Sequence, residues 1–341
     1  MVDQAKIHKM VQIENIEKHK EAVDQLKNNF VSLPNKAQAG DDLIRLTQDD
    51  DRYVRWGAAS ALGSAFRSIP NASKAQAWDD LHRLTQDDDC YVRSGAASAL
   101  GSAFNSIPAA SKAQAWDDLH RLTQDDDISV RRCAADVLGS AFNSIPAASK
   151  AQAWDDLHRL TQDDDSDVRS RAASALGSTF NSIPEASKAQ AWDDLHRLTQ
   201  DDNRSVRSRA ASALGSAFNS IPAASKAQAW DDLHRLTQDD YSDVRWGAAS
   251  ALGSAFNSIP AASKVQAWDD LHRLTQDDGP YVRNEAAPAF GSAFNSIPAA
   301  SKAQAWDDLI RLTQDDDSDL LHLALHLIPF PLLPKLRPGM T

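Results

Sequence analysis

Hydrophobic and polar positions recur along this chain with a period of 38 residues. Gly40 stands at the first of these positions, one period before the first tryptophan of the series. Seven tryptophans follow at the same spacing: Trp78, Trp116, Trp154, Trp192, Trp230, Trp268 and Trp306. Such a fixed period is typical of repeat architectures, in which each unit is one supersecondary element that buries its apolar face against its neighbours.

The first half of each unit predicts an amphipathic helix. In a typical copy, Ser149 and Gln152 fit a capping box, which satisfies the first backbone amides of a helix. Asp155, Asp156 and Arg159 gather on the side expected to face solvent, and Asp155 and Arg159 have the spacing of a favourable ion pair. Apolar side chains gather on the opposite side: Ala153, Trp154, Leu157 and Leu160.

The second half predicts another helix after an acidic turn. Asp165, the last residue of the turn, is suited to cap that helix, and Pro184 ends it. In the seventh copy Pro280 falls at the first helical position, where proline is tolerated. No alternating β-branched run predicts a strand. The apolar stripe of this second helix comprises Val168, Ala172, Ala175, Leu176, Phe180 and Ile183.

The pattern Asp-x-x-Val-Arg-x-x-Ala-Ala-x-Ala-Leu-Gly, as in residues 165–177, resembles the HEAT-repeat family in its short prokaryotic form. The resemblance implies an all-α fold, a right-handed α-solenoid (superhelix) of antiparallel helix pairs, with about eight repeats of 38 residues. It also implies that the Asp triplets pair with the arginines of the Val-Arg motif in adjoining repeats. Proteins of this family are mostly interaction scaffolds, and a few are DNA-repair glycosylases or pigment-lyase subunits.

The two ends of the chain depart from the repeat. We expect residues 1–37 to form an N-terminal capping helix, because residues 3–33 read as one long polar helix in which Leu26 matches Leu62 of the first full repeat. The repeat array then covers residues 38–319. We expect residues 320–341 to form a divergent apolar tail, which packs over the last repeat, exposes an apolar patch that could join two copies or touch a membrane, or is a repeat altered by a change of reading frame.

Variation between the copies concentrates on one face of the second helices. The variable positions span about 140° opposite the apolar stripe, and they bring in Trp, Tyr and Arg, the residues enriched at binding hot spots. Neutral drift of exposed positions is the alternative explanation. We predict that these positions form a concave partner-binding face: Arg52, Tyr53, Trp56, Tyr91, Arg132, Arg171, Arg204, Arg209, Tyr241, Trp246, Tyr281, Asn284 and Glu285.

The net charge of the chain and its distribution limit the class of partner that the variable face can bind. Lys and Arg number 36 against 48 Asp and Glu, a net charge of −12, which argues against general nucleic-acid binding. The acidity lies mainly in the constant Asp segments, whereas the middle of the variable face carries arginines that Asp136 and Asp167 partly offset. We therefore expect a protein or peptide partner with an acidic segment.

Residues that could carry chemistry fit structural roles better. One histidine recurs per unit, but neighbouring repeats would hold the imidazoles about 9–10 Å apart, too far to share a metal ion, so we expect a ladder of histidines along one edge of the helices. The Asp163-x-Asp165-x-Asp167 spacing lacks the glycine and glutamate of a calcium loop. Cys90 and Cys133 are expected to lie too far apart for a disulfide. We thus predict no catalytic residue, metal or cofactor.

An enzyme or enzyme subunit remains the alternative. A glycosylase-like HEAT protein acting on nucleic acid would need a singular carboxylate, for which Asp136 and Glu285 are the candidates, and a regulatory or lyase subunit is the other possibility. With two cysteines, no apolar leader at the N-terminus and no apolar run of 18 residues, we expect a cytoplasmic protein without a membrane span.

Overall fold

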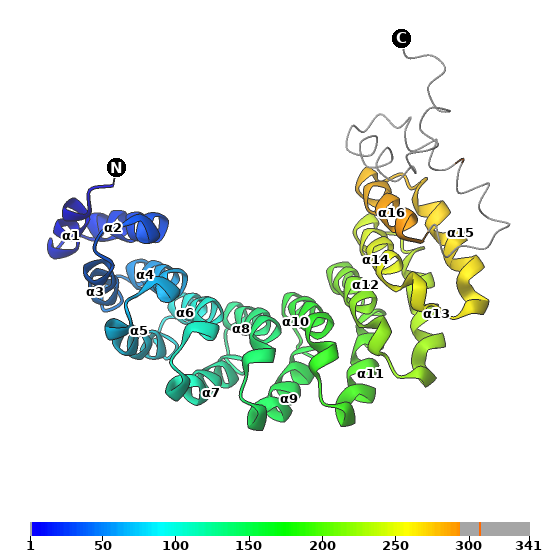
Figure 1. Ribbon diagram of the computed structural model, residues 1–341, viewed down its shortest axis with the longest axis horizontal. Helices are drawn as coiled ribbons and strands as arrows, with labels where there is room; N and C mark the ends of the chain where they lie inside the picture. Colours follow the sequence, from blue (N-terminus) through cyan, green and yellow to red (C-terminus); the bar gives the residue numbers. More distant parts are fainter. Residues whose placement is uncertain (1, 294–306, 308–341) are drawn as a thin grey trace, which may run out of the picture. The chain divides into compact units, whose positions relative to one another are not determined.

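The computed structural model describes residues 2–293 and residue 307. Its helices occur as repeated pairs of a first and a second helix joined by an acidic turn (Figure 1). No strand occurs among these residues, and none of their helices is both long and apolar enough to cross a membrane. Trp306 and the predicted C-terminal segment 320–341, with its proposed role in joining two copies, lie outside the described residues.

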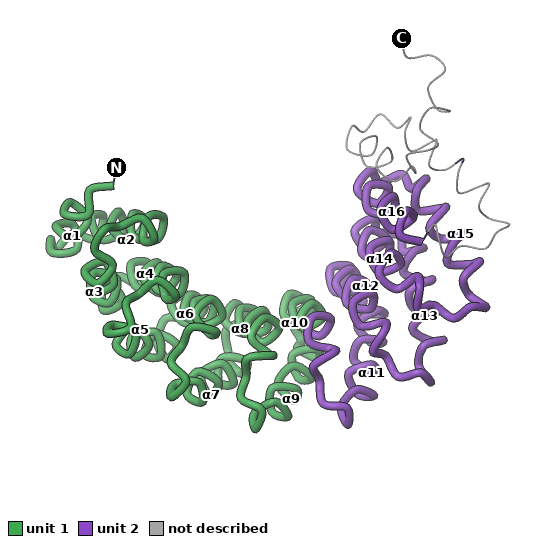
Figure 2. Tube along the Cα trace, viewed as in Figure 1, with its two compact units in different colours: residues 1–175 green, residues 176–341 purple. Residues whose placement is uncertain are grey.

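The chain divides into two compact units, residues 1–175 and 176–341 (Figure 2). The first helices are α1 (Gln4–Gln12), α3 (Lys36–Leu46), α5 (Asn71–Leu84), α7 (Lys112–Leu122), α9 (Lys150–Leu160), α11 (Lys188–Leu198), α13 (Lys226–Leu236) and α15 (Lys264–Leu274). The second helices are α2 (Ile16–Asn29), α4 (Arg52–Ala65), α6 (Cys90–Ala103), α8 (Ile128–Ala141), α10 (Ser166–Thr179), α12 (Arg204–Ala217), α14 (Ser242–Ala255) and α16 (Pro280–Ala293).

Short 3₁₀ turns flank the helices. They extend the second helices at Phe30–Ser32, Phe66–Ser68, Phe104–Ser106, Phe142–Ser144, Phe180–Ser182, Phe218–Ser220 and Phe256–Ser258. Others lead into the first helices at Ala109–Ser111, Ala147–Ser149, Glu185–Ser187, Ala223–Ser225 and Ala261–Ser263. The leading turns replace the predicted capping box: Ser149 has helical backbone angles and its side chain caps nothing. The box is absent because the amide of Ser149 already bonds to the carbonyl of Pro146 at 2.9 Å.

The second helices begin as the sequence predicts. Asp165 accepts hydrogen bonds from the amides of Asp167 at 2.9 Å and Val168 at 3.1 Å, so it caps α10. Pro280 is the first residue of α16. These starts set the register that places the variable positions on one face.

The N-terminal segment forms two helices, so the expected single long helix is wrong. Asn15 interrupts it, because its side chain accepts a hydrogen bond from the amide of Lys18 and caps α2. Leu26 is fully buried, as its match to Leu62 predicts. The segment is therefore a complete helix pair that packs on the first repeat.

Bulky and small residues divide between the two layers of helices. The tryptophans of the first helices are buried, and the indole of Trp78 donates to Gln114 of the next repeat at 3.0 Å. Second helices meet through small residues: a Cβ added at Gly63 would lie only 2.4 Å from the Cα of Ala99. Because the second helices can approach more closely than the first, unit 1 curves with its second helices on the inner side (Figure 1).

Candidate functional site

The predicted binding residues of unit 1 lie on the second helices and reach solvent. Tyr53, Trp56 and Tyr91 are 52%, 44% and 55% exposed, unusually open for large aromatic side chains. Arg52 is also exposed. These four residues come from two adjacent helices, α4 and α6, so the structure brings them together within unit 1.

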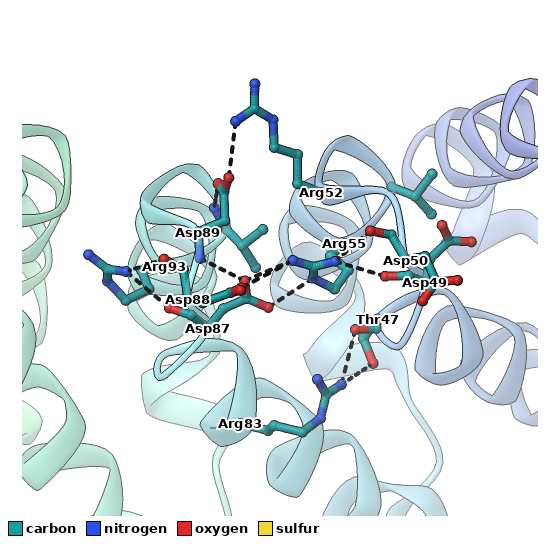
Figure 3. Close-up of polar contacts among 12 residues, drawn as sticks. Thr47, Asp49, Asp50, Arg52, Arg55, Arg83, Asp87, Asp88, Asp89 and Arg93 are labelled. Carbon is teal, nitrogen blue, oxygen red and sulfur yellow. Dashed lines mark hydrogen bonds and ion pairs between the residues drawn. The ribbon is translucent and has the colours of Figure 1, made fainter.

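Arg52 connects the aromatic residues of this cluster. Its guanidinium lies 4.9 Å from the ring of Tyr53 and 5.3 Å from that of Tyr91, so it bridges the two helices through cation–π contacts. It donates to Asp89 at 3.1 Å (Figure 3) and to the hydroxyl of Tyr53, also at 3.1 Å. The side-chain nitrogen of Lys20, on α2, lies 5.8 Å from the centre of the Tyr53 ring. Lys20 stands at the position matching Trp56 but is not among the predicted binding residues.

A shallow groove of about 380 Å³ lies between α6 and α8. Val137 stands where α6 has Ala99, and a Cβ added at Gly101 would lie 2.7 Å from Cγ2 of Val137. The larger side chain holds the two helices apart and opens the groove. Asp136 lies on its rim.

The arginines of unit 1 differ in their partners. Arg171 is exposed and lies 3.5 Å from Asp136, so the predicted offset of positive charge is a direct ion pair. Arg132 is half-buried and makes no ion pair within the described part of the chain. An exposed pair contributes little stability, so Arg171 is available to exchange Asp136 for a carboxylate of a partner.

Unit 2 carries a second group of the predicted residues. Arg204 lies 5.2 Å from the ring of Tyr241 and 3.7 Å from Asp243, and Arg209 is exposed without an ion pair among the described residues. Trp246 is 37% exposed. The remaining residues lie on α16, where Tyr281 is 78% exposed, whereas Asn284 and Glu285 are half-buried.

Tyr241 occupies a position that a capping residue normally takes. The equivalent residues Asp89 and Asp127 accept two backbone amides each, but the side chain of Tyr241 makes no capping hydrogen bond. Loss of such a cap costs about 1 kcal/mol. The chain therefore presents an aromatic ring here at the expense of helix stability.

The arginines of the Val-Arg motif pair with aspartates of the next acidic turn, as the resemblance implies. We call this series of pairs between repeats the arginine–aspartate ladder. Arg55 pairs with Asp87 through two hydrogen bonds of 2.8 and 2.9 Å (Figure 3). Arg93 pairs in the same way with Asp125 at 2.7 and 2.8 Å. Burial alone would raise the pKa of Asp125, but hydrogen bonds from Arg93 and the backbone amide of Asp127 outweigh it and hold the pKa below its usual value. The same pattern recurs at Arg131–Asp163, Arg207–Asp239 and Arg245–Asp277.

A second ladder involves the repeated histidines, as their recurrence once per unit predicts, but the aspartates that bind them were not among the predicted partners. Asp156 is only 3% exposed, so its predicted exposure is wrong. It accepts from His120 of the preceding repeat at 2.6 Å and from Arg159 at 2.8 Å, which also replaces the expected Asp155–Arg159 pair. Arg159 in turn donates to Thr123. Stacking of repeats covers a position that a single helix would leave exposed.

These contacts between repeats give structural roles to the repeated histidines and to the aspartates of the acidic turns, which were considered above as possible metal ligands. His82, His120, His196 and His234 each contact a buried aspartate of the next repeat, so they link repeats. Within the acidic turns, the first aspartate binds an arginine and the third caps a helix. Cys90 and Cys133 are free thiols.

Comparisons with known proteins agree with this architecture. Family models described as HEAT repeats match residues 41–115, 79–177, 119–215, 155–253 and 193–287. No curated protein matches the chain.

Among solved structures, the crystal structure of an engineered protein from the Northeast Structural Genomics Consortium is similar, with a TM-score of 0.53 and 24% identity over 96% of this chain and 88% of that one. A homology model of the full-length AP-3 complex in an intermediate open conformation has a TM-score of 0.71 and 16% identity over 92% of this chain and 54% of that one.

A chain in a structure of Kap95p with RanGDP has a TM-score of 0.61 and 15% identity over 94% of this chain and 45% of that one. The chain thus spans about half the length of these last two relatives. At these identities the likenesses concern the fold. Because the family models together cover residues 41–287, this chain belongs to the HEAT-repeat family and forms an α-solenoid of helix pairs.

Proposed function

We propose that this chain is a non-catalytic interaction scaffold that binds a peptide or protein partner on the exposed face of its second helices. The observation that carries the proposal is the nature of the side chains that vary between copies. They include exposed aromatic residues and exposed arginines, whereas the constant arginines of the Val-Arg motif pair with aspartates of the framework. Exposed Tyr, Trp and Arg are the residues that most often anchor an interface.

The arginines support a partner with an acidic segment. Arg132 and Arg209 make no ion pair within the described residues, and Arg171 has only the exposed Asp136. A carboxylate of a partner could bind these guanidinium groups through two parallel hydrogen bonds. The scaffolding role of the related HEAT-repeat proteins is consistent with this proposal.

The alternative of a nucleic-acid-acting enzyme has less support. Asp136, a candidate carboxylate, is half exposed and pairs with Arg171 at 3.5 Å, which suits a surface ion pair better than a general base. The net charge of −12 also opposes polyanion binding. A gel shift at several salt concentrations would reveal such binding as a strongly salt-dependent complex.

Selection of peptides tests the proposal. A random 12-residue peptide library is selected on the full chain and, separately, on a variant carrying Arg132→Glu, Arg171→Glu and Arg209→Glu. A matched variant carrying Lys9→Glu, Lys27→Glu and Arg67→Glu changes the same charge at exposed positions outside the variable face. We expect acidic peptides to enrich on the wild type and the matched variant only. Enrichment of the same peptides on all three proteins would contradict the proposed face.

A further inference from the structure

Three exposed rings in unit 1 form a patch that the arginines of the proposed face do not explain. We call Tyr53, Trp56 and Tyr91 the aromatic patch. Tyr53 and Trp56 are three residues apart on α4 and therefore share a face of that helix. On α6, Tyr91 lies four residues before Gly95, so these two also share a face.

The structure holds the aromatic patch in place before any partner binds. A Cβ added at Gly95 would lie 2.6 Å from Cδ1 of Trp56, so the indole packs directly on the backbone of α6. Arg52 fixes the other two rings by lying between them, 4.9 and 5.3 Å from their centres. Aromatic side chains held in this way lose little conformational entropy on binding.

Every polar side-chain atom of the aromatic patch can donate a hydrogen bond, because these atoms belong to one indole N–H and two phenol O–H groups. The indole N–H of Trp56 and the hydroxyl of Tyr91 make no hydrogen bond within the described residues, although both side chains are exposed. The nearby cations are already paired, Arg52 with Asp89 and Lys20 with Glu17. The patch therefore favours an uncharged partner that presents hydrogen-bond acceptors and apolar rings.

We propose that the aromatic patch binds an extended proline-rich segment in the polyproline II conformation. Such a segment exposes its backbone carbonyls, and its prolines bring no N–H donor. Three of its residues rise about 9 Å, which matches the spacing of about 8–10 Å between packed helices, so successive turns can meet α4 and α6. The inference rests on the proposed function and names the partner chemistry of one part of the face.

The test is a titration of the full, ¹⁵N-labelled chain with acetylated decaproline amide, followed through the indole signals of the tryptophans. Trp56→Phe assigns the signal of Trp56. We expect the chemical shift of the Trp56 indole N–H to change during the titration and to reach half of its full change at a decaproline concentration of about 1 mM or less. Trp246 is an internal comparison, because Asp243 and Glu285 stand where Tyr53 and Gly95 flank Trp56. Its signal should move less.

Tyr91→Ala should abolish saturation in the same concentration range, and a circular-dichroism melt shows whether the variant is folded. An unchanged Trp56 signal with decaproline would overturn the inference, as would equal movement of Trp246. A response to oligoglutamate but not decaproline would overturn it in favour of an acidic segment. If peptide selection still yields acidic peptides that need the arginines, the proposed function survives this failure; if it yields none, both fail.

Discussion

Two neighbouring aspartates, Asp125 and Asp126, have different environments. Asp125 is largely buried against Arg93 and accepts two of its N–H groups, whereas the side chain of Asp126 is 96% exposed. Both residues recur in each acidic turn, so the sequence pattern alone does not separate them. The difference arises because Asp125 lies between the repeats and accepts two N–H groups of Arg93, whereas Asp126 accepts one from the solvent side at 3.3 Å.

We predict that Asp125→Asn lowers the free energy of unfolding by about 2 kcal/mol, because Arg93 keeps its burial but loses a charged acceptor. Asp126→Asn should change it by no more than about 0.5 kcal/mol. Urea unfolding at pH 7 measures both values. Equal effects of the two substitutions would show that the ladder contributes no more than an exposed pair.

Tyr241 offers the opposite experiment, in which a substitution adds a missing interaction. Tyr241→Asp should stabilise the chain by about 1 kcal/mol, since an aspartate can accept amides at the start of α14 as Asp89 does for α6. If the ring serves binding, the same variant should lose affinity for selected peptides that contact unit 2. Thermal melting and peptide titration report the two effects, and a variant that is no more stable would contradict the missing cap.

Sequence reasoning succeeded where a residue's role is fixed within its own unit. Leu157 and Trp154 are buried and Asp165 caps α10, because helix periodicity and capping are local. It failed for Asp156, whose burial depends on His120 of the preceding repeat, and for Ser149, whose turn is already bonded by Pro146. The residues of the aromatic patch were predicted to be exposed, but not to be held in place. Their fixed arrangement depends on contacts with Arg52 and Gly95 between two neighbouring repeats.

At the scale of helices, small residues determine how closely the second helices approach. A Cβ at Gly63 would overlap the backbone of Ala99, which no side-chain rotation can relieve. Trp78 and its equivalents fill the layer of first helices instead. The two layers therefore impose different spacings on the same stack within each unit.

We predict that Gly63→Ala destabilises unit 1 by about 2 kcal/mol, although alanine is the better helix former, because α4 and α6 must move apart. Ser64→Ala, at the next and exposed position, should change stability by at most about 0.5 kcal/mol. Denaturant melts compare the two variants. A stabilised Gly63→Ala protein would mean that the two helices are not in close contact.

At the scale of the whole molecule, the arginine–aspartate ladder makes the free energy of unfolding depend on pH. The pKa values of Asp87, Asp125, Asp163 and Asp277 lie below the ordinary value because of hydrogen bonds from arginines and backbone amides that outweigh burial. A lowered folded-state pKa means that the stabilisation is complete above the unfolded pKa of about 4 and disappears as the pH falls through the folded value.

We therefore expect the free energy of unfolding to fall steadily as the pH drops below about 4, and the fall to be smaller in Asp125→Asn, which has one fewer such group. Urea unfolding between pH 2 and pH 7 gives the curve. A wild-type curve that is flat in this range, or one that the substitution leaves unchanged in slope, would contradict this assignment.

The net charge of −12 is unevenly distributed over the molecule, and this distribution matters for function. Aspartates of the turns and first helices supply much of it, while the variable face bears arginines that lack buried partners. Binding should therefore depend on where a charge lies rather than on the total. Two variants with the same net charge can separate these effects.

The most direct measurement is the affinity of one selected acidic peptide for three proteins by calorimetric titration. These are the wild type, the variant with Arg132, Arg171 and Arg209 changed to Glu, and the matched variant with Lys9, Lys27 and Arg67 changed to Glu. We predict that the first variant binds at least about tenfold more weakly than the wild type and that the matched variant binds within about twofold of it. Equal loss of affinity in both variants, or in neither, would contradict a binding face on the second helices.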